Sequence, residues 1–348
     1  MEAPTPEEPV SSAAAASAPR SAHRSGVEVD EVMRSALAAA LGSLPTRRFD
    51  PGEVIMCEGE NSEWFAYLAS GVAEVSRSAP TGVVRIGVAQ PGSVLGELAL
   101  VTGRPRSATV TATAEVVAFV GTATDFHGVL ADRRVAEGIA RVVAGRLAAL
   151  ADPVSVPLAN GITMLLRPGL STDGPFLAAG LAAMSRESLQ RRFFSGGMPP
   201  ESVIRYLLDV DYVDHFAWVA IDAADPELVP IGSARFIRSH TDHREADIAF
   251  GLVDDWQGRG VGTLLMEALG VAAAASGIDR FTADVLRENT AMRRLLARPS
   301  TRWVGTEPGV VHAVCEASEF GSRIDPPIRE ALARVAATIV WNSAAVLL

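Results

Sequence analysis

The stretch QGRGVGT, residues 257–263, decides the fold of the second half of the chain. It directly follows a run typical of a β-strand, residues 246–253, and directly precedes a helical pattern over 263–276. Glycines let successive backbone N–H groups converge on an anion, and the positive end of a helix dipole strengthens that attraction. The order strand, glycine loop and helix therefore predicts a binding site for a phosphate or pyrophosphate.

Three ligand classes compete for this loop. A P-loop ends in Gly-Lys-Ser/Thr, which is absent here. A dinucleotide fingerprint needs a third glycine where this chain has Thr263. The pattern Gln-x-x-Gly-x-Gly instead resembles the acetyl-CoA pyrophosphate loop of the GNAT superfamily of N-acetyltransferases. A glycine-rich connection without a ligand remains the plain alternative.

The GNAT resemblance implies which residues meet acetyl-CoA. In that fold the strand before the loop splays from its neighbour and offers backbone groups to the pantetheine arm, here around residues 250–253. An Asn at the start of a later helix commonly meets the cofactor, and Asn289 occupies that place, where a simple helix N-cap is the equal alternative. The implied cofactor-binding residues are Phe250, Leu252, Val253, Gln257, Gly258, Arg259, Gly260, Val261, Gly262, Thr263 and Asn289.

The first half of the chain has a different texture. From residue 48 to residue 121, short runs of Val, Ile, Phe and Thr are interrupted every eight to twelve residues by turn signals. That rhythm is typical of a small antiparallel β sandwich or barrel. Helical patterns precede it at 29–41 and follow it at 129–150, and the Pro-containing segment 152–157 ends the second helix. Beyond it, strands and helices alternate, as in a mixed α/β domain.

A compact motif near residue 100 predicts a second anion site. Gly96 lets the backbone approach a ligand, Glu97 can accept from a ribose hydroxyl, and Arg106 can fork onto phosphate oxygens. The motif resembles the phosphate-binding cassette of cyclic-nucleotide-binding domains, as in catabolite activator proteins and cAMP-dependent kinase regulatory subunits. The alternative is a turn with a surface Glu–Arg pair. The resemblance implies these cyclic-nucleotide-binding residues: Gly96, Glu97, Leu98, Arg106 and Ser107.

The whole arrangement resembles the cAMP-regulated protein lysine acetyltransferases of actinobacteria, and segments 191–194, 211–219 and 246–250 match that family. The fold class predicted is two-domain: an all-β cyclic-nucleotide-binding, jelly-roll-like barrel with flanking helices, followed by an α/β GNAT fold. The predicted boundaries are a disordered leader at 1–26, a cyclic-nucleotide-binding domain at 27–151, a linker at 152–160, a GNAT domain at 161–319 and a C-terminal helical segment at 320–348.

Acetylation of an amine needs a base, because a lysine amine is protonated near neutral pH. In the family the base is a Glu on the strand leading into the loop, and the matching position is Asp247, one methylene shorter. Glu245, on the same face of the strand, is the reserve. No Tyr follows Tyr212 to act as general acid, and the turn at 298–301 replaces the glycine-containing turn of the family.

Composition narrows the remaining choices. The net charge of −10 argues against a nucleic-acid-binding face. The acidic, Pro-rich start is unlike a signal peptide, and we expect a cytoplasmic protein without membrane contact. Cys57 and Cys315 fit no metal or redox spacing and are expected to be buried in a reducing compartment. His240 and His243 lie in a polar turn, so no metal site is predicted.

The sequence therefore predicts cAMP-regulated acetyl transfer from acetyl-CoA to lysine side chains of proteins. The resemblance points to acyl-CoA synthetases among the substrates. Two alternatives stay open: a nucleotide sensor with a degenerate acetyltransferase domain, and a GNAT enzyme acting on a small amine. We expect residues 320–348 to cover the acceptor site when the nucleotide is absent. The sequence names neither the acceptor, nor cAMP over cGMP, nor the oligomeric state.

Overall fold

A computed structural model describes residues 35, 40–61, 63–79 and 82–347 of the chain. The expected leader at 1–26 and most of the expected helix at 29–41 lie outside these residues. The described chain divides into two compact units. The N-terminal unit contains the chain up to Ala151, residues 211–213 and the residues from Ala333 onward, and the C-terminal unit contains residues 152–210 and 214–332.

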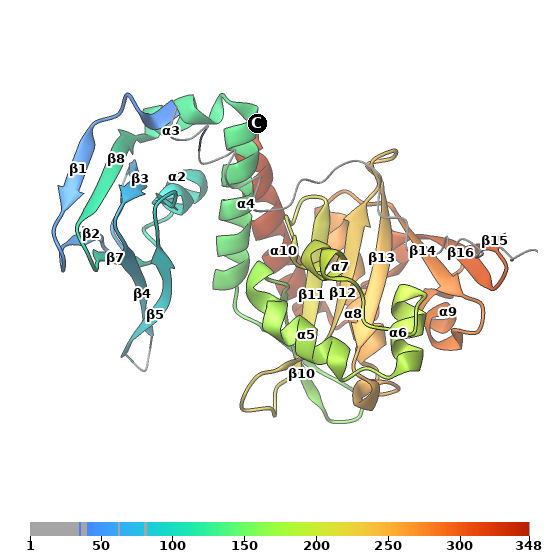
Figure 1. Ribbon diagram of the computed structural model, residues 1–348. Helices are drawn as coiled ribbons and strands as arrows, with labels where there is room; N and C mark the ends of the chain where they lie inside the picture. The colour runs from blue at the N-terminus through green and yellow to red at the C-terminus, as the bar shows by residue number, and fades with distance from the viewer. Residues whose placement is uncertain (1–34, 36–39, 62, 80–81, 348) are drawn as a thin grey trace, which may run out of the picture. The chain divides into compact units, whose positions relative to one another are not determined.

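The N-terminal unit is a sandwich of two antiparallel four-stranded sheets, with strand orders β1-β8-β3-β6 and β2-β7-β4-β5 (Figure 1). One hydrophobic cluster joins buried side chains of both sheets, for example Leu68 from one and Val110 from the other. This arrangement confirms the predicted all-β fold. The strands are β1 (Thr46–Phe49), β2 (Val54–Met56), β3 (Trp64–Ser70), β4 (Ala73–Ala79), β5 (Gly82–Ala89), β6 (Val94–Leu95), β7 (Thr109–Ala112) and β8 (Val116–Thr122).

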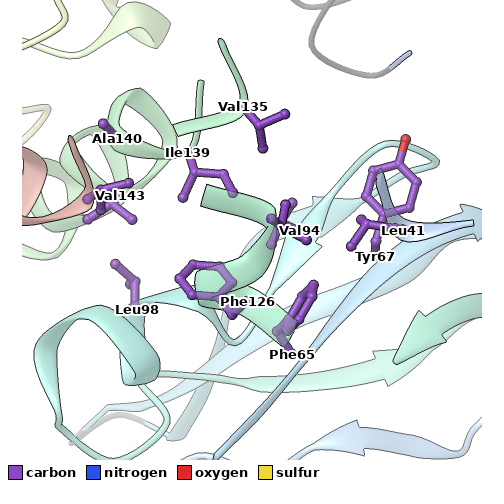
Figure 2. Close-up of a cluster of buried hydrophobic side chains, with 12 residues drawn as sticks. Leu41, Phe65, Tyr67, Val94, Leu98, Phe126, Val135, Ile139, Ala140 and Val143 are labelled. Atoms are coloured by element: carbon purple, nitrogen blue, oxygen red, sulfur yellow. The ribbon is translucent and has the colours of Figure 1, made fainter. Parts of the chain in front are cut away.

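Helices α2 (Glu97–Thr102), α3 (Ala123–Leu130) and α4 (Arg133–Leu150) flank the sandwich. They share a second cluster with one sheet, in which Phe65 of β3 meets Phe126 of α3 edge to face at 5.3 Å (Figure 2). The single helix expected at 129–150 is in fact two helices. Asp132 caps the N–H groups of Arg134 and Val135 and so begins a new helix after α3 has ended.

The C-terminal unit is built on one eight-stranded sheet of order β15-β16-β14-β13-β12-β11-β10-β9. Among its described strands, only β13 and β14 pair in parallel. The expected linker contains β9, which pairs with β10 and is therefore part of the sheet. The strands are β9 (Val154–Pro157), β10 (Thr163–Pro168), β11 (His215–Asp222), β12 (Pro230–Arg238), β13 (Glu245–Leu252), β14 (Arg280–Leu286), β15 (Arg302–Glu307) and β16 (Val310–Glu316).

Helices cover both faces of this sheet, which confirms the predicted α/β class (Figure 1). The fully buried Trp218 of β11 donates its indole N–H to the carbonyl of Ala268 on α8, at 3.0 Å. The opposite face, with Ala217 and Val219, lines a cavity together with α5 and α7. The helices are η1 (Ser171–Asp173), α5 (Gly174–Ala182), α6 (Arg186–Phe193), α7 (Glu201–Leu208), η2 (Asp254–Trp256), α8 (Val261–Ala275), α9 (Thr290–Leu296) and η3 (Ala317–Glu319).

The last helix, α10 (Pro326–Leu347), begins in the C-terminal unit and from Ala333 belongs to the N-terminal unit. Val346 lies in the same cluster as Ile139 and Val143 of α4, and the Ser343 hydroxyl donates to the Ala140 carbonyl at 3.3 Å. By length and composition alone α10 is apolar enough to span a membrane. A core helix of a protein without membrane contact can meet the same criterion, and one third of this apolar stretch is buried within the structure.

The two cysteines differ in exposure. Cys315 is buried in β16, as predicted. The prediction for Cys57 is wrong, because this residue follows the end of β2 and is exposed at the start of a turn.

Candidate functional site

The centre of the C-terminal unit is a fork between its two parallel strands. β13 and β14 pair over only three positions, the last of which joins Asp247 to Thr282. Beyond that point β13 stays paired with β12 as far as Leu252, while β14 stays paired with β16. The edge of β13 that faces β14 is consequently unpaired from Ile248 onward. Its backbone groups are open to a ligand that carries amides of its own.

The glycine loop predicted to bind a pyrophosphate lies directly after this edge. Gly258 and Gly260 have φ of 72° and 92°, which an L side chain rarely adopts. A Cβ at either position would meet nothing within 4 Å, so backbone conformation alone requires glycine there. Gly260 caps the 15-residue helix α8, whose first-turn N–H groups at residues 261–263 have no partner within the helix. This is the geometry of an anion site.

Two side chains of the loop differ in role: Gln257 anchors the loop, and Arg259 places a positive charge beside it. The Gln257 amide donates to the Ser188 hydroxyl of α6 at 3.0 Å and to the Asp254 carboxylate at 3.1 Å. It therefore holds the loop in place, and the side chain does not point freely at a ligand. Arg259 is exposed, with its guanidinium 5.1 Å from the ring centre of Trp256, and its charge lies beside the loop.

Asn289 caps helix α9, because its side-chain oxygen accepts from the N–H of Met292 at 3.1 Å. The residue is buried, yet its side-chain nitrogen forms no hydrogen bond with any described residue. The N-cap interpretation therefore holds for the oxygen, and the nitrogen remains available to a cofactor.

Asp247 stands at the point where the fork opens. Its side chain is accessible to solvent, but protein surrounds it closely enough to remove much of its hydration. This desolvation, together with the negative charge of Asp284, raises the pKa of Asp247 to about 7, against the opposing pull of Arg192 and His312. A carboxylate with a pKa near neutrality is a far better base than an ordinary aspartate.

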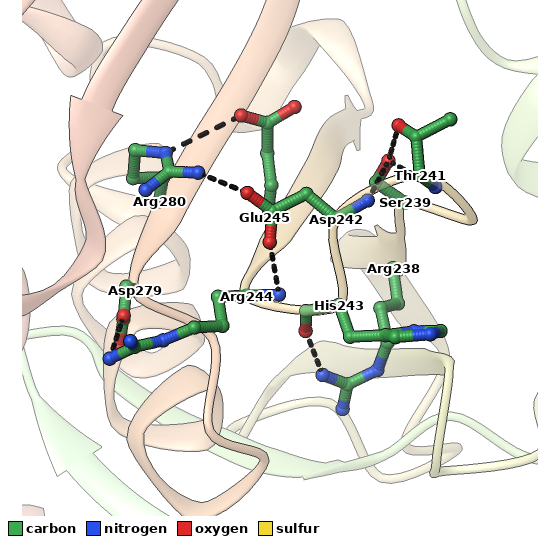
Figure 3. Close-up of polar contacts among 9 residues, drawn as sticks. All are labelled: Arg238, Ser239, Thr241, Asp242, His243, Arg244, Glu245, Asp279 and Arg280. Atoms are coloured by element: carbon green, nitrogen blue, oxygen red, sulfur yellow. Dashed lines mark hydrogen bonds and ion pairs between the residues drawn. The ribbon is translucent and has the colours of Figure 1, made fainter.

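Glu245, the reserve base, lies where the strands are still paired. Its carboxylate is 3.5 Å from the Arg280 guanidinium, which also holds Asp242 at 2.5 Å (Figure 3). Glu245 therefore belongs to an ion-pair network at the start of β13, and Asp247 is the carboxylate that faces the fork.

Three charged residues beside Asp247 were not singled out from the sequence. Arg192 of α6 lines a cavity of about 90 Å³ formed by α5, α6, α7 and strands β11 to β13, and burial lowers its pKa to about 10 against the attraction of Asp247. Nδ1 of His312 on β16 and the carboxylate of Asp284 on β14 lie 2.8 Å apart, at hydrogen-bonding distance. An aspartate in the middle of a strand, residues 280–286, whose centre is otherwise mostly apolar was the one signal available.

Arg235, which also lines this cavity, forms a buried pair with His215. Arg235 donates to the Leu207 carbonyl at 2.5 Å and meets Nε2 of His215 at 3.1 Å. Because Nδ1 of His215 donates to the Asp209 carbonyl, Nε2 is the acceptor and the ring is neutral. Burial and the neighbouring Arg235 accordingly lower the pKa of His215 to about 3. His215 positions Arg235 and is not a base.

The unusual turn at 298–301 is firmly anchored. The buried Arg298 guanidinium meets the buried carboxylate of Glu267 on α8 at 2.6 Å. The Ser300 hydroxyl donates to Glu319 at 2.6 Å. The departure from the family pattern thus has compensating contacts of its own, which would be costly to break because they are buried.

The predicted cassette in the N-terminal unit is compact and charged. Gly96 has φ of 85°, and the buried Arg106 donates to the carbonyls of Gly96 at 2.7 Å and Trp64 at 2.5 Å. Burial lowers the pKa of Arg106, against the attraction of Glu97 and Glu60. Ser107 is half-buried beside it, whereas the Leu98 side chain lies in the hydrophobic cluster of Figure 2.

The most informative group in the cassette is the carboxylate of Glu97. Its side chain is 1% exposed, and neither oxygen accepts a well-directed hydrogen bond, although Arg146 of α4 brings its Nη1 within 2.5 Å of Oε1. Buried carboxylates without hydrogen bonds are rare in folded proteins. A ribose hydroxyl would supply a well-directed donor in addition to Arg146, so the residues present fit a cyclic nucleotide.

Fork, glycine loop and cassette together define a class of protein: an acetyltransferase of the GNAT fold joined to a cyclic-nucleotide-binding domain. Residues 46–133 match the cyclic nucleotide-binding domain family, and residues 164–299 match the acetyltransferase (GNAT) domain family. Both predicted domains are thereby confirmed.

Relatives of known identity narrow the class further. Acetyltransferase Pat of Mycolicibacterium smegmatis is 37% identical over 278 residues, which cover 80% of this chain and 83% of the relative. The structure of the cAMP-binding acyltransferase from Mycobacterium smegmatis is 29% identical, covers 91% of this chain and 99% of its own, and has a TM-score of 0.47. The GNAT domain of S. lividans PAT is 27% identical, covers 47% and 96%, and has a TM-score of 0.43. The chain belongs to the Pat family of acetyltransferases.

Proposed function

We propose that this protein transfers the acetyl group of acetyl-CoA to lysine side chains of other proteins, and that cAMP bound to the N-terminal unit controls the rate. The observation that carries the catalytic part is the position of Asp247, at the last residue pair before β13 and β14 separate. It lies beside the unpaired edge of β13, along which the pantetheine arm would extend.

Asp247 is the proposed general base. A lysine ammonium must lose a proton before its nitrogen attacks the thioester carbonyl, and the nitrogen becomes steadily more acidic as the new C–N bond forms. A base with a pKa of about 7 accepts that proton far more readily than a carboxylate with an ordinary pKa. The transfer is direct or runs through one water, which compensates for a side chain one methylene shorter than glutamate.

The leaving group needs little help. The C–S bond of the tetrahedral intermediate breaks and releases the CoA thiolate, whose thiol pKa resembles that of cysteine, about 8.5. The absence of a tyrosine after Tyr212 is therefore compatible with turnover. Residues 258–263 would bind the pyrophosphate through backbone N–H groups, with Arg259 adding charge at the rim.

In the N-terminal unit, Glu97 would accept from the ribose 2′-hydroxyl of cAMP and Arg106 would pair with the cyclic phosphate. Arg146 links this carboxylate to α4, since it also donates to the Val94 carbonyl at 2.8 Å. α4 shares a cluster with the end of α10, and α10 begins in the C-terminal unit. Binding of cAMP at Glu97 would therefore act on Arg146 and α4, and through α4 on the end of α10.

We retain the proposal that the C-terminal segment covers the acceptor site in the absence of cAMP. Deleting residues 320–348 is a poor test, because the N–H of Gly321 donates to the buried Glu267 at 2.7 Å. Truncation after Leu332 spares that contact but removes Val346 from the cluster of the N-terminal unit. Calorimetric titration must therefore show that the truncated protein still binds cAMP, and its activity without cAMP should then rise. The control is Trp341→Ala in the full chain, since this side chain is 66% exposed. A truncated enzyme as dependent on cAMP as the full chain contradicts the lid.

The function is tested by measuring CoA release by full-length protein with a lysine-containing peptide or protein, with and without cAMP or cGMP. We expect transfer that rises with cAMP. No transfer to any lysine acceptor, despite measurable binding of acetyl-CoA, would favour a sensor with a degenerate acetyltransferase domain. Transfer to a polyamine but to no peptide would favour the small-amine alternative.

A further inference from the structure

The face of the sheet that carries Asp247 also carries two other titratable groups, Asp284 and His312. Asp247 lies opposite Thr282 in the register of β13 and β14. Side chains alternate along a strand, so Asp284, two residues beyond Thr282, is on the same face and immediately past the point where the strands separate. The two aspartates therefore stand on the two arms of the fork.

His312 extends this arrangement by one strand. It is directly opposite Asp284 in the register of β14 and β16, and its Nδ1 is 2.8 Å from the Asp284 carboxylate. When the ring is protonated the pair has no net charge, and when the ring is neutral the pair is negative. The pair thus presents Asp247 with a charge that depends on the state of His312.

Arg192 completes the surroundings of Asp247 from the opposite side. It projects from α6, which packs against β13, and the cavity beside it contains no carboxylate except Asp173, which is already paired with Arg167 at 2.7 Å. Asp247 itself forms no ion pair within the part of the chain that the structure describes. Three groups from α6, β14 and β16 consequently act on its carboxylate through space, and they carry both signs of charge.

We propose that Asp284 and His312 are positioning residues for acetyl transfer: their paired charges fix the pH above which Asp247 can take the proton of the acceptor amine. This inference rests on the proposed role of Asp247. Asp284 alone opposes ionisation of the neighbouring carboxylate, because two negative charges across the fork repel each other. His312 moderates that repulsion by holding and partly neutralising Asp284.

A purely structural pair would behave differently. An exposed cross-strand Asp–His contact contributes little to stability, and the side chains here are 52% and 32% exposed. If the pair only joined β14 to β16, its removal would change protein stability slightly and leave the pH dependence of the reaction where it was. The pH profile therefore separates the two roles.

The experiment measures kcat/KM for a lysine peptide against pH, from about pH 5.5 to about pH 9.5, with full-length enzyme at saturating cAMP. In Asp284→Asn the acid limb should move to lower pH by about one unit, because the repulsion is gone. In His312→Gln it should move to higher pH by about half a unit, because the full charge of Asp284 remains. Adding Asp284→Asn to His312→Gln should remove the upward shift.

The matched control is Glu307→Gln, which removes an exposed negative charge from β15 of the same sheet and should leave the limb in place. A second readout, titration of the Asp247 carboxyl carbon by NMR and assigned with Asp247→Asn, should report the same two opposite shifts without turnover. Shifts of the same sign, or no shift, in both variants overturn the inference. If Asp247→Asn keeps both its activity and its acid limb, the proposed base is wrong instead.

Discussion

The two proposed anion sites of this protein have the same backbone conformation at a glycine but opposite surroundings. Gly96 in the cassette and Gly260 in the loop have φ of 85° and 92°, and each begins a helix. A Cβ on Gly96 would lie 2.1 Å from the Arg106 guanidinium, whereas a Cβ on Gly260 would meet nothing within 4 Å. The cassette is built from buried charges that crowd its glycine, and the loop is built from open backbone N–H groups.

This difference predicts that the cassette is selective for one ligand, whereas the loop binds phosphate groups in general. Buried Glu97 and Arg106 are costly to desolvate and repay that cost only when a ligand of matching shape and charge completes their contacts. The N–H groups of residues 258–263 would donate to the oxygens of any phosphate placed at the loop. A regulatory ligand must be discriminated, while a shared cosubstrate needs only to be held in the right orientation.

The largest effect should come from replacing Asp247, the proposed base, which belongs to neither anion site. Asp247→Asn is expected to lower kcat/KM by about 10²- to 10⁴-fold, because the base is removed while both binding sites stay intact. In the parent enzyme kcat/KM should fall as pH drops below about 7, as Asp247 becomes protonated. Steady-state kinetics against pH test both statements.

Asp247→Glu is the control, and we expect it to retain activity, since it keeps the carboxylate and restores the family's residue. An Asp247→Asn variant that binds acetyl-CoA and reacts at the parent rate would show that Asp247 is not the base.

Within the cassette, Arg106→Lys should weaken cAMP binding by about 100-fold, because a lysine cannot hold the phosphate and the two backbone carbonyls together. Calorimetric titration with cAMP measures the change. Acetyl-CoA binding should be unchanged, so a parallel loss there would indicate that the whole protein is disturbed and the two sites are not independent.

The same small substitution at each glycine tests the comparison directly. Gly260→Ala and Gly96→Ala both force a side chain into a left-handed conformation, and each should weaken its own ligand by about 10-fold. The Gly96 variant should suffer more, because its methyl group also collides with Arg106. Titration of each variant with cAMP and with acetyl-CoA gives four affinities, and equal losses of both ligands in either variant contradict the separation.

The smallest effect is expected at the rim of the loop. Arg259→Gln should raise the KM for acetyl-CoA by about two- to fivefold at low salt and by less at high salt, because an exposed charge is screened. Initial rates at two ionic strengths measure it. An effect that salt does not alter would mean that Arg259 contacts the cofactor directly in a desolvated place.

Local patterns predicted much of this molecule. The glycine motifs, the turn rhythm of the sandwich and the alternation of strands and helices depend on neighbouring residues, so the two-domain fold followed from them. The two anion sites stay predictions. The resemblance to the GNAT family favoured Asp247 over Glu245, but it could not show that Arg280 holds Glu245.

The group around Asp247 was beyond such patterns. Arg192, Asp284 and His312 are far apart in sequence and meet only through strand register and the placement of α6. The Asp132 cap and strand β9 were missed for a related reason, since a single capping side chain and a sheet partner overrode the local pattern.

Helix α10 has a consequence for how the protein is made. The N-terminal unit takes part of its hydrophobic cluster from Val346, which follows the whole acetyltransferase domain in the sequence. A ribosome releases that residue only after the entire acetyltransferase has been synthesised. The unit that would regulate the enzyme is therefore the last to be completed, and a fragment ending at Ala151 would lack part of its core. Gene fusions that exchange this sensor for another must carry both ends of the chain.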